Sequence, residues 1–488
     1  MSNPIETGLH ASTIGRLNLK LIPFLMLLYM VAYIDKSNIS VAALQMNADL
    51  GLTARMYGLG VGLFFLTYIL LEVPSSLILT KVGARRWIAR IMITWGIVAA
   101  GMCLVQSANQ LYVMRLLLGA AEAGFTPGII YYLSQWYPKT DRARAMSFFY
   151  IGAALASVIG LPLSGAFLHM DGIFGVSGWR WLFLLEGIPA VILGIVVLRY
   201  LPDSPESTHW LDAAQKKWLA RTIAAEQATT PISHKDAWHV AFRNRRVWLL
   251  SLFWLLQAFG TIGITLFLPL IVQSVSKQGS FTVSVMSALP FFVACIFMYF
   301  NGRHSDKTSE RGWHLGGPLL GAGVLLALAV FSGNQWLSYG MLVLAVGLNW
   351  AATPVFWATT TEYLSGPAAA VSIALINSIA NLAGLGLPPA MGWIKDVTDN
   401  YDYALLLVAG ALLAGGVLGI YLGTGKTPTV AQPVIQGNVD EISRALNRPA
   451  AGTADSAFAR RVPSDRRHGK PCRPARQRIG CSRAVGQW

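Results

Sequence analysis

Two opposite charges lie inside one apolar stretch, residues 115–128, with the sequence RLLLGAAEAGFTPG. Arg115 and Glu122 are seven residues apart, or two turns of an α-helix, so their side chains project from one face with Gly119 between them. A charge inside a membrane helix is costly and normally faces a polar cavity or a charged partner. We therefore interpret both as candidates for function. An ion pair that only holds two helices together is the alternative.

A second polar group interrupts the first apolar stretch, where residues 33–38 read YIDKSN. Tyr33 and Lys36 are three residues apart, and so are Asp35 and Asn38, which places two polar edges side by side on a helix. Lys36 is a cation that could hold a carboxylate, and Asp35 could carry a proton. In the alternative interpretation, Asp35 and Lys36 only neutralise partners on other helices.

The later part of the chain supplies neutral polar side chains at helical spacing. They form three stripes: Gln257, Thr261 and Thr265; Asn349, Thr353 and Trp357; Asn377 and Asn381. A single stripe of this kind often only bonds to a neighbouring helix, but three converging stripes favour a binding cavity. With the charges above, they would suit an anion that has hydroxyl groups or an aromatic body.

The elements that must position these residues are membrane helices. Of the 488 residues, 54% are hydrophobic and 12% charged, and the mean hydropathy is +0.50. About twelve apolar runs recur between about Leu19 and Leu422, each near the roughly 20 residues that cross a bilayer. The runs do not alternate in polarity as barrel strands would. We predict an all-α membrane protein, with twelve transmembrane helices in two six-helix bundles.

The net charge of +15 does not indicate a nucleic-acid partner, because +8 of it lies in the basic tail from Lys426 onward. The four cysteines show no zinc or disulfide spacing, and GTGKT at residues 423–427 lacks the first glycine of a phosphate-binding loop. We predict no metal, no cofactor and no enzymatic site, because no nucleophile–base pair is evident.

Charged loops divide the chain. We predict a cytoplasmic N-terminus (1–18), an N-terminal six-helix bundle (19–201), a cytoplasmic central loop (202–246), a C-terminal six-helix bundle (247–424) and a basic, disordered cytoplasmic tail (425–488). By the positive-inside rule, the loop with Arg85 and Arg86 faces the cytoplasm, as does its counterpart with Asp306 and Arg311. We expect these two loops to act in gating. In the central loop, Leu211, Trp218 and Leu219 indicate short amphipathic helices.

Two halves with matching loops are the internal repeat of a transporter that rocks around a central site. Proton coupling needs a carboxyl group that changes its protonation state during the cycle, and Asp35 and Glu122 are the best candidates. Glu72 is a third, and Glu186 we interpret as structural. A membrane receptor that binds the anion without moving it is the alternative from another class.

Several motifs together resemble one known family. YIDKSNISVAAL, FFLTYILLEVPSSL, KVGARRWIARIMITWG, RLLLGAAEAGFTPG, GWRWLFLLEGIPAVILG, GRHSDKTSERGWH and INSIANLAGLGLP are similar to the anion:cation symporters of the major facilitator superfamily, most of all to bacterial tartrate, phthalate and 4-hydroxyphenylacetate permeases. The similarity runs from about Leu19 to the twelfth helix.

The resemblance implies uptake of an organic carboxylate such as tartrate together with protons across the bacterial inner membrane, by a monomer. Aromatic carboxylates and sugar acids are alternative substrates. Asp35 and Glu122 would be the protonation sites, Lys36 would hold the carboxylate, and Tyr33, Tyr68, Trp357 and Asn377 would line the cavity. The secondary candidates are Arg115, Asn38, Gln257, Asn381 and Glu72. The chain departs from the family at Lys36, where the family has arginine, and at Ser76, where it generally has asparagine.

Overall fold

The computed structural model describes residues 4–228, 239, 241–363 and 369–424, and these residues form helices and no strand. The predicted tail 425–488 lies outside them. The long helices follow one another as α1 (Pro4–Lys20), α2 (Ile22–Asp49), α3 (Ala54–Val82), α4 (Ala84–Gly101), α5 (Ala108–Glu122), α6 (Phe125–Trp136), α7 (Lys139–Leu168), α8 (Gly178–Tyr200), α9 (Ala213–Ala228), α11 (Arg245–Ala258), the π-helix η4 (Phe259–Ile264), α12 (Thr265–Ser276), α13 (Ser280–Thr308), α14 (Gly312–Phe331), α15 (Gln335–Tyr363), α16 (Ala369–Thr398) and α17 (Asp402–Thr424).

Twelve of the described segments can cross a membrane. Eleven are long and apolar enough by length and composition, and α7 adds the shorter apolar stretch Gly152–Leu168. The fourth span comprises α5 and α6, and the seventh comprises α11, η4 and α12. The prediction of twelve transmembrane helices is confirmed.

The spans place apolar side chains outside and charges inside. Leu70, Leu77 and Ile97 are each about 60% exposed, as expected of side chains that face lipid. Five charged side chains within the spans are instead almost completely buried: Asp35, Glu72, Arg115, Glu122 and Glu186. The polar residues picked out by the sequence thus lie in the interior.

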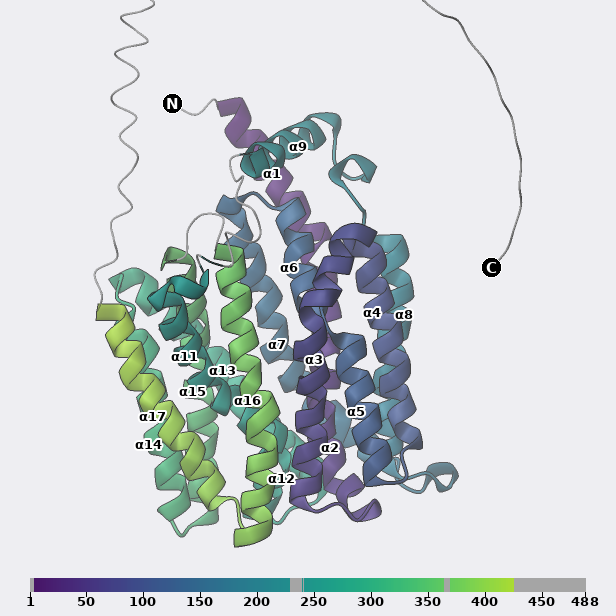
Figure 1. Cartoon of the computed structure of the whole chain (residues 1–488), viewed down its shortest axis with the longest axis vertical. Helices are drawn as coiled ribbons and strands as arrows, with labels where there is room; N and C mark the ends of the chain where they lie inside the picture. The colour runs from purple at the N-terminus through teal and green to yellow at the C-terminus, as the bar shows by residue number, and fades with distance from the viewer. Residues whose placement is uncertain (1–3, 229–238, 240, 364–368, 425–488) are drawn as a thin grey trace, which may run out of the picture. The chain divides into compact units, whose positions relative to one another are not determined.

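The helices pack as two groups of six spans (Figure 1). In the first group α4 packs on α8, α2 on α7 and α3 on α5; in the second α14 packs on α17, α13 on α15 and α11 on α16. The groups meet where α3 packs on α16, α7 on α13 and α2 on α12. The exact ends of the predicted domains stay a prediction.

Helices α1 and α9 lie together at one end of the spans, which we call the amino-terminal face (Figure 1). Arg16 Nη1 donates to Gln215 Oε1 at 2.8 Å, and the rings of His10 and Trp218 are 5.3 Å apart. Leu219 is fully buried, so the apolar side of α9 packs against protein. A helix is present in this connection, as expected, and α1 is one of its partners.

The two groups are joined at the opposite face. Both oxygens of the Asp396 carboxylate, near the end of α16, accept bonds of 2.9 Å from the backbone N–H groups of Ala54 and Arg55 at the start of α3. Nearby, Gly392 lies so close that a Cβ would come within 2.1 Å of the Ala54 carbonyl oxygen. A carboxylate at a helix N-terminus satisfies free N–H groups and complements the helix dipole. This contact therefore stabilises closure of the opposite face.

We predict that Asp396→Ala opens this face. Loss of a carboxylate from a helix N-terminus costs about 1 kcal/mol, which corresponds to roughly a fivefold change in population. Spin labels at Ala48 and Tyr403, both at the opposite face, should show more of a long-distance population by double electron–electron resonance in a background without the native cysteines.

Asp399→Ala is the matched control, because Asp399 is fully exposed and pairs only locally with Lys395 at 2.9 Å. An unchanged distance distribution in Asp396→Ala, or an equal change in the control, would contradict the assigned role of Asp396.

Candidate functional site

The centre of the first group holds an ion pair between adjacent spans. Lys36 Nζ on α2 lies 3.0 Å from Glu122 Oε1 on α5, with the two side chains 27% and 3% exposed. The Lys36 ammonium also lies 4.7 Å from the ring centre of Tyr68 and 5.5 Å from that of Phe64, both on α3. Three spans thus converge on one cation, and Lys36 keeps part of its surface accessible.

Asp35 is held by neutral donors. Its Oδ2 accepts a bond of 2.8 Å from Trp95 Nε1, and its Oδ1 accepts one of 3.3 Å from Asn38 Nδ2. Within the described residues no lysine or arginine lies within 4 Å of this carboxylate. The side chains of neighbouring residues point about 100° apart around a helix. Lys36 can therefore pair with Glu122 on α5 while Asp35 faces Trp95 on α4. Asp35 and Lys36 therefore do not pair with each other.

Arg115 is a second buried cation, only 1% exposed. Its Nε donates to the Gly60 carbonyl at 3.3 Å, and its guanidinium lies 4.8 Å from the Phe64 ring centre. Gly119 allows α5 and α3 to approach, because a Cβ there would come within 2.1 Å of the Phe64 carbonyl oxygen. Arg115, Gly119 and Glu122 all lie on the buried face of α5, as their spacing predicts.

The fourth span is interrupted directly after Glu122. Helix α5 ends at Glu122, Gly124 adopts φ +88°, and α6 begins at Phe125. The freed Ala123 carbonyl accepts a bond of 2.7 Å from Ser75 Oγ. Such left-handed backbone strongly favours glycine. Glu122 thus sits at a helix end, and its Oε2 is buried without a hydrogen-bond partner among the described residues.

The second group brings two of its three polar stripes together. Gln257 Nε2 donates to the Asn349 carbonyl and to Thr353 Oγ1, both at 2.9 Å. The seventh span is not a regular helix as predicted, because Thr261 lies in the π-helix η4. The Asn349 side chain faces this segment, and a Cβ on Gly260 would lie 2.5 Å from its Nδ2. Both polar atoms of that amide lack a partner in the described part of the chain.

The remaining predicted binding residues are spread over α2, α15 and α16. Trp357 packs edge-on against Trp254 with ring centres 5.2 Å apart, while Asn377 and Asn381 are partly buried on α16. Tyr33 approaches Trp350 across the two groups, with ring centres 6.3 Å apart. The structure therefore does not assemble all of them around Lys36.

Glu72 joins the two groups near this centre. It lies on α3 and is 6% exposed. Its Oε2 accepts a long bond of 3.5 Å from Ser378 Oγ on α16.

The predicted gating residues make contacts within their own groups. Arg85 pairs with Asp203 at 2.5 Å, and Arg311 pairs with Asp306 at 2.8 Å and bonds to Ser305 Oγ at 2.9 Å. Arg86 is exposed. Their role in gating stays a prediction.

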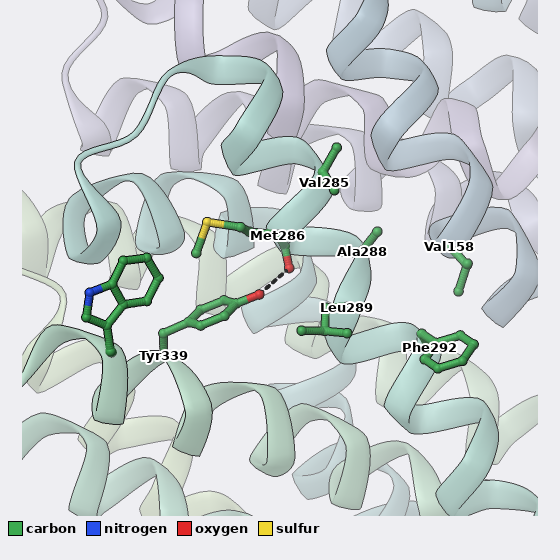
Figure 2. Close-up of a pocket in the computed structure, with 8 residues that line it drawn as sticks. Val158, Val285, Met286, Ala288, Leu289, Phe292 and Tyr339 are labelled. Atoms are coloured by element: carbon green, nitrogen blue, oxygen red, sulfur yellow. Dashed lines mark hydrogen bonds between the residues drawn. The ribbon is translucent and has the colours of Figure 1, made fainter.

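A groove of about 570 Å³ lies away from these charges. Figure 2 shows its apolar walls, which come from α7, α13 and α15, and the Tyr339 hydroxyl bonded to the Met286 carbonyl at 2.9 Å. Leu289 and Phe292 in its wall are about half exposed. It has no charged lining residue, so it is a lipid-facing surface feature and not the candidate anion site.

Sequence reasoning missed the side chains that support the charges. Trp95 donates to Asp35, and Trp87 Nε1 donates at 3.0 Å to the same Ser75 Oγ that bonds the broken fourth span. A buried tryptophan usually finds a partner for its N–H group, but the burial of Trp95 is visible only in the structure.

Buried charges in the centre of twelve membrane spans define an integral membrane protein with an internal polar site, and comparisons with known proteins identify its family. The model of the Major Facilitator Superfamily matches residues 25–388. Two proteins from Agrobacterium vitis are each named "Putative tartrate transporter". One is 42% identical to this chain, in a match that covers 87% of this chain and 94% of the relative. The other is 44% identical, in a match that covers 86% of this chain and 96% of the relative. The "Putative metabolite transport protein NicT" of Pseudomonas putida is 41% identical over 84% of this chain and 94% of its own.

Solved structures show the same fold. A D-xylose–proton symporter superimposes with a TM-score of 0.66 at 14% identity, covering 84% of this chain and 98% of that one. A bacterial homologue of the human lysosomal transporter Spinster gives 0.65 at 19% identity, covering 87% and 96%. The chain belongs to the major facilitator superfamily. It is a multi-pass membrane transporter of small organic substrates and not an enzyme.

The break after Glu122 yields a prediction. Gly124→Ala would force alanine to φ +88° and place its Cβ 2.2 Å from Ser75 Oγ. A left-handed non-glycine residue costs about 1–3 kcal/mol before the clash is counted. The purified variant should therefore have a lower apparent melting temperature in detergent, measured by tryptophan fluorescence.

Gly410→Ala on α17 is the control, since an added Cβ there meets no atom within 4 Å. Equal melting temperatures for the two variants would show that the backbone at Gly124 is not constrained as described.

Proposed function

We propose that this protein takes up a small organic carboxylate, of the tartrate class, together with protons, by alternating access across the bacterial inner membrane. The amino-terminal face with α1 and α9 is cytoplasmic in this proposal, in agreement with the basic loops that lie there. The first and last six spans, with boundaries at residues 202–246, are the units that move. The working form is a monomer.

The observation that carries the proposal is the buried ion pair of Lys36 and Glu122. A substrate carboxylate can bind Lys36 only by competing with the Glu122 carboxylate, which lies 3.0 Å from the ammonium. A proton on Glu122 removes that competition, because a neutral acid attracts a cation far less strongly. Proton binding at Glu122 thus favours anion binding at Lys36, which is the linkage that symport requires.

The structure around Glu122 favours such an exchange. Its Oε2 has no hydrogen-bond partner among the described residues, so a proton can be added there without breaking a bond. Asp35, held only by Trp95 and Asn38, is the second proposed protonation site. Among the described residues, no lysine or arginine forms an ion pair with this carboxylate within 4 Å, and burial of an unpaired charge is costly.

The relatives support the substrate class. Two of them, 42% and 44% identical, carry tartrate in their names. Lys36 would hold one carboxylate of such an anion, with Tyr68 and Tyr33 beside it. Neutral donors of the second group, Gln257, Asn349 and Asn377 among them, would bind its hydroxyl groups.

We predict that Lys36→Gln abolishes transport and that Lys36→Arg retains part of it. Loss of a charge-assisted bond to a carboxylate costs about 1.5–3 kcal/mol, or roughly 10- to 100-fold in affinity. The measurement is pH-gradient-driven uptake of radiolabelled tartrate into proteoliposomes, with phthalate, 4-hydroxyphenylacetate and galactonate offered in parallel. Lys217→Gln, at an exposed position on α9, is the control.

Wild-type uptake should collapse when a protonophore is added. Full uptake by Lys36→Gln would show that Lys36 does not bind the substrate. Wild-type uptake that does not depend on the pH gradient would exclude proton coupling.

We predict that Glu122→Gln separates exchange from accumulation. Glutamine mimics the protonated acid, so Lys36 is permanently free to bind the anion while the proton can no longer be released. Exchange of internal for external tartrate at equal pH should persist, and uphill uptake driven by a pH gradient should be lost.

Glu206→Gln, at an exposed residue after α8, is the matched control and should behave as wild type in both assays. Uphill accumulation by Glu122→Gln at the wild-type level would show that Glu122 carries no coupled proton.

A further inference from the structure

Glu186 is a buried carboxyl group to which the mechanism above gives no role. It lies on α8 and is 5% exposed. Its Oε1 accepts a short bond of 2.6 Å from Ser164 Oγ on α7. Its Oε2 is buried and has no hydrogen-bond partner in the described part of the chain. Within the same residues, no lysine, arginine or histidine nitrogen lies within 4 Å of it.

The surroundings of Glu186 contain another acid, and among the described residues no cation forms an ion pair with it. From α2, Asp35 and the Asn38 amide both lie near enough to interact with it. From α7, its neighbour is the neutral Ser164. From α4, Gly96 and Ala100 approach the neighbouring Gly187 through their backbone atoms. Two carboxylates in such a setting repel each other, so the pair cannot both be ionised at low cost.

Asn38 connects the two acids. It donates to Asp35 Oδ1 at 3.3 Å and also interacts with Glu186. A change of charge on Asp35 is therefore felt at Glu186. Asp35 also interacts with Glu122 and Arg115, so the pair lies within electrostatic reach of the ion pair of Lys36 and Glu122.

Glu186 and Asp35 lie at different distances from the opposite face of the membrane spans. Glu186 is eight residues into α8, which begins at Gly178 near the opposite face, so it lies about 12 Å along the helix from that end. Asp35 is fourteen residues from the end of α2 at Asp49, or about 21 Å. Glu186 thus lies closer to the opposite face, the side from which protons enter in the proposed uptake cycle.

We propose that Glu186 is a third proton-carrying residue, coupled to Asp35 through Asn38, and that it binds one proton per cycle. In each cycle an O–H bond forms at Glu186 with a proton from water on the opposite face, and the same bond breaks when the proton is released to water on the amino-terminal face. This inference rests on the proposed proton-coupled transport, and it adds one proton to the stoichiometry.

The test is the ratio of protons to substrate, measured in proteoliposomes as the tartrate gradient at which an imposed pH gradient and membrane potential produce no net flux. Glu186→Gln should lower this ratio by one proton relative to wild type and flatten the pH dependence of uptake, while tartrate exchange at equal pH stays within twofold of wild type. Ser164→Ala, which keeps the acid and removes its donor, should leave the ratio unchanged.

The possible outcomes separate the two proposals. If wild type shows no proton-driven flux, the proposed symport fails. If wild type is proton-driven and Glu186→Gln keeps the same ratio and pH profile, Glu186 is structural and this inference is wrong. Should Glu186→Gln not fold, Glu186→Asp gives the answer, since a shorter acid that carries the proton keeps the wild-type ratio with a shifted pH profile, and an unshifted profile contradicts the proposal.

Discussion

The cost of placing charge in a membrane interior governs this structure. Five side chains that can be charged are almost completely buried in the described spans, and Lys36 is partly buried beside them. Four of the six are acids, namely Asp35, Glu72, Glu122 and Glu186, and two are bases. Each unpaired charge in such a medium costs several kcal/mol. The acids outnumber the bases, so protons on some of them would lower this cost, which is the basis of the proposed proton coupling.

The same constraint explains where the backbone is irregular. A free carbonyl in lipid is as costly as a missing hydrogen bond, so breaks in membrane helices occur where protein or cavity water can satisfy them. The break after Glu122 is satisfied by Ser75, and the π-helix η4 lies against the Asn349 side chain. Both irregular segments lie beside the polar residues of their group. Broken helices at the binding level are a common feature of secondary transporters.

The sequence was sufficient for much of the fold, because apolar runs and basic loops follow directly from the bilayer. It also identified the buried charges, since a charge within an apolar run has few alternatives to the interior. Their partners were not predictable. Helical spacing placed Arg115 and Glu122 on one face, but only packing shows that Glu122 pairs with Lys36 and that Arg115 bonds to the Gly60 carbonyl. Spacing gave no sign that α5 ends at Glu122, because that depends on Gly124 and on Ser75 from another helix.

The two groups of spans carry different kinds of polar side chain, and this difference bears on how substrate binding could move them. The first group holds the cations and acids on α2 and α5, whereas the second offers the neutral amides of Gln257 and Asn349 on α11 and α15. In the proposed cycle, an anion held by Lys36 would also have to reach donors of the second group such as the Asn349 amide, whose polar atoms lack a partner among the described residues. Binding would thus draw the groups together, and closure would be driven by contacts that exist only with substrate present. A proton alone leaves those amides unsatisfied, and an anion alone must displace Glu122 from Lys36. Only the two together satisfy both groups, and this condition would prevent either from crossing by itself.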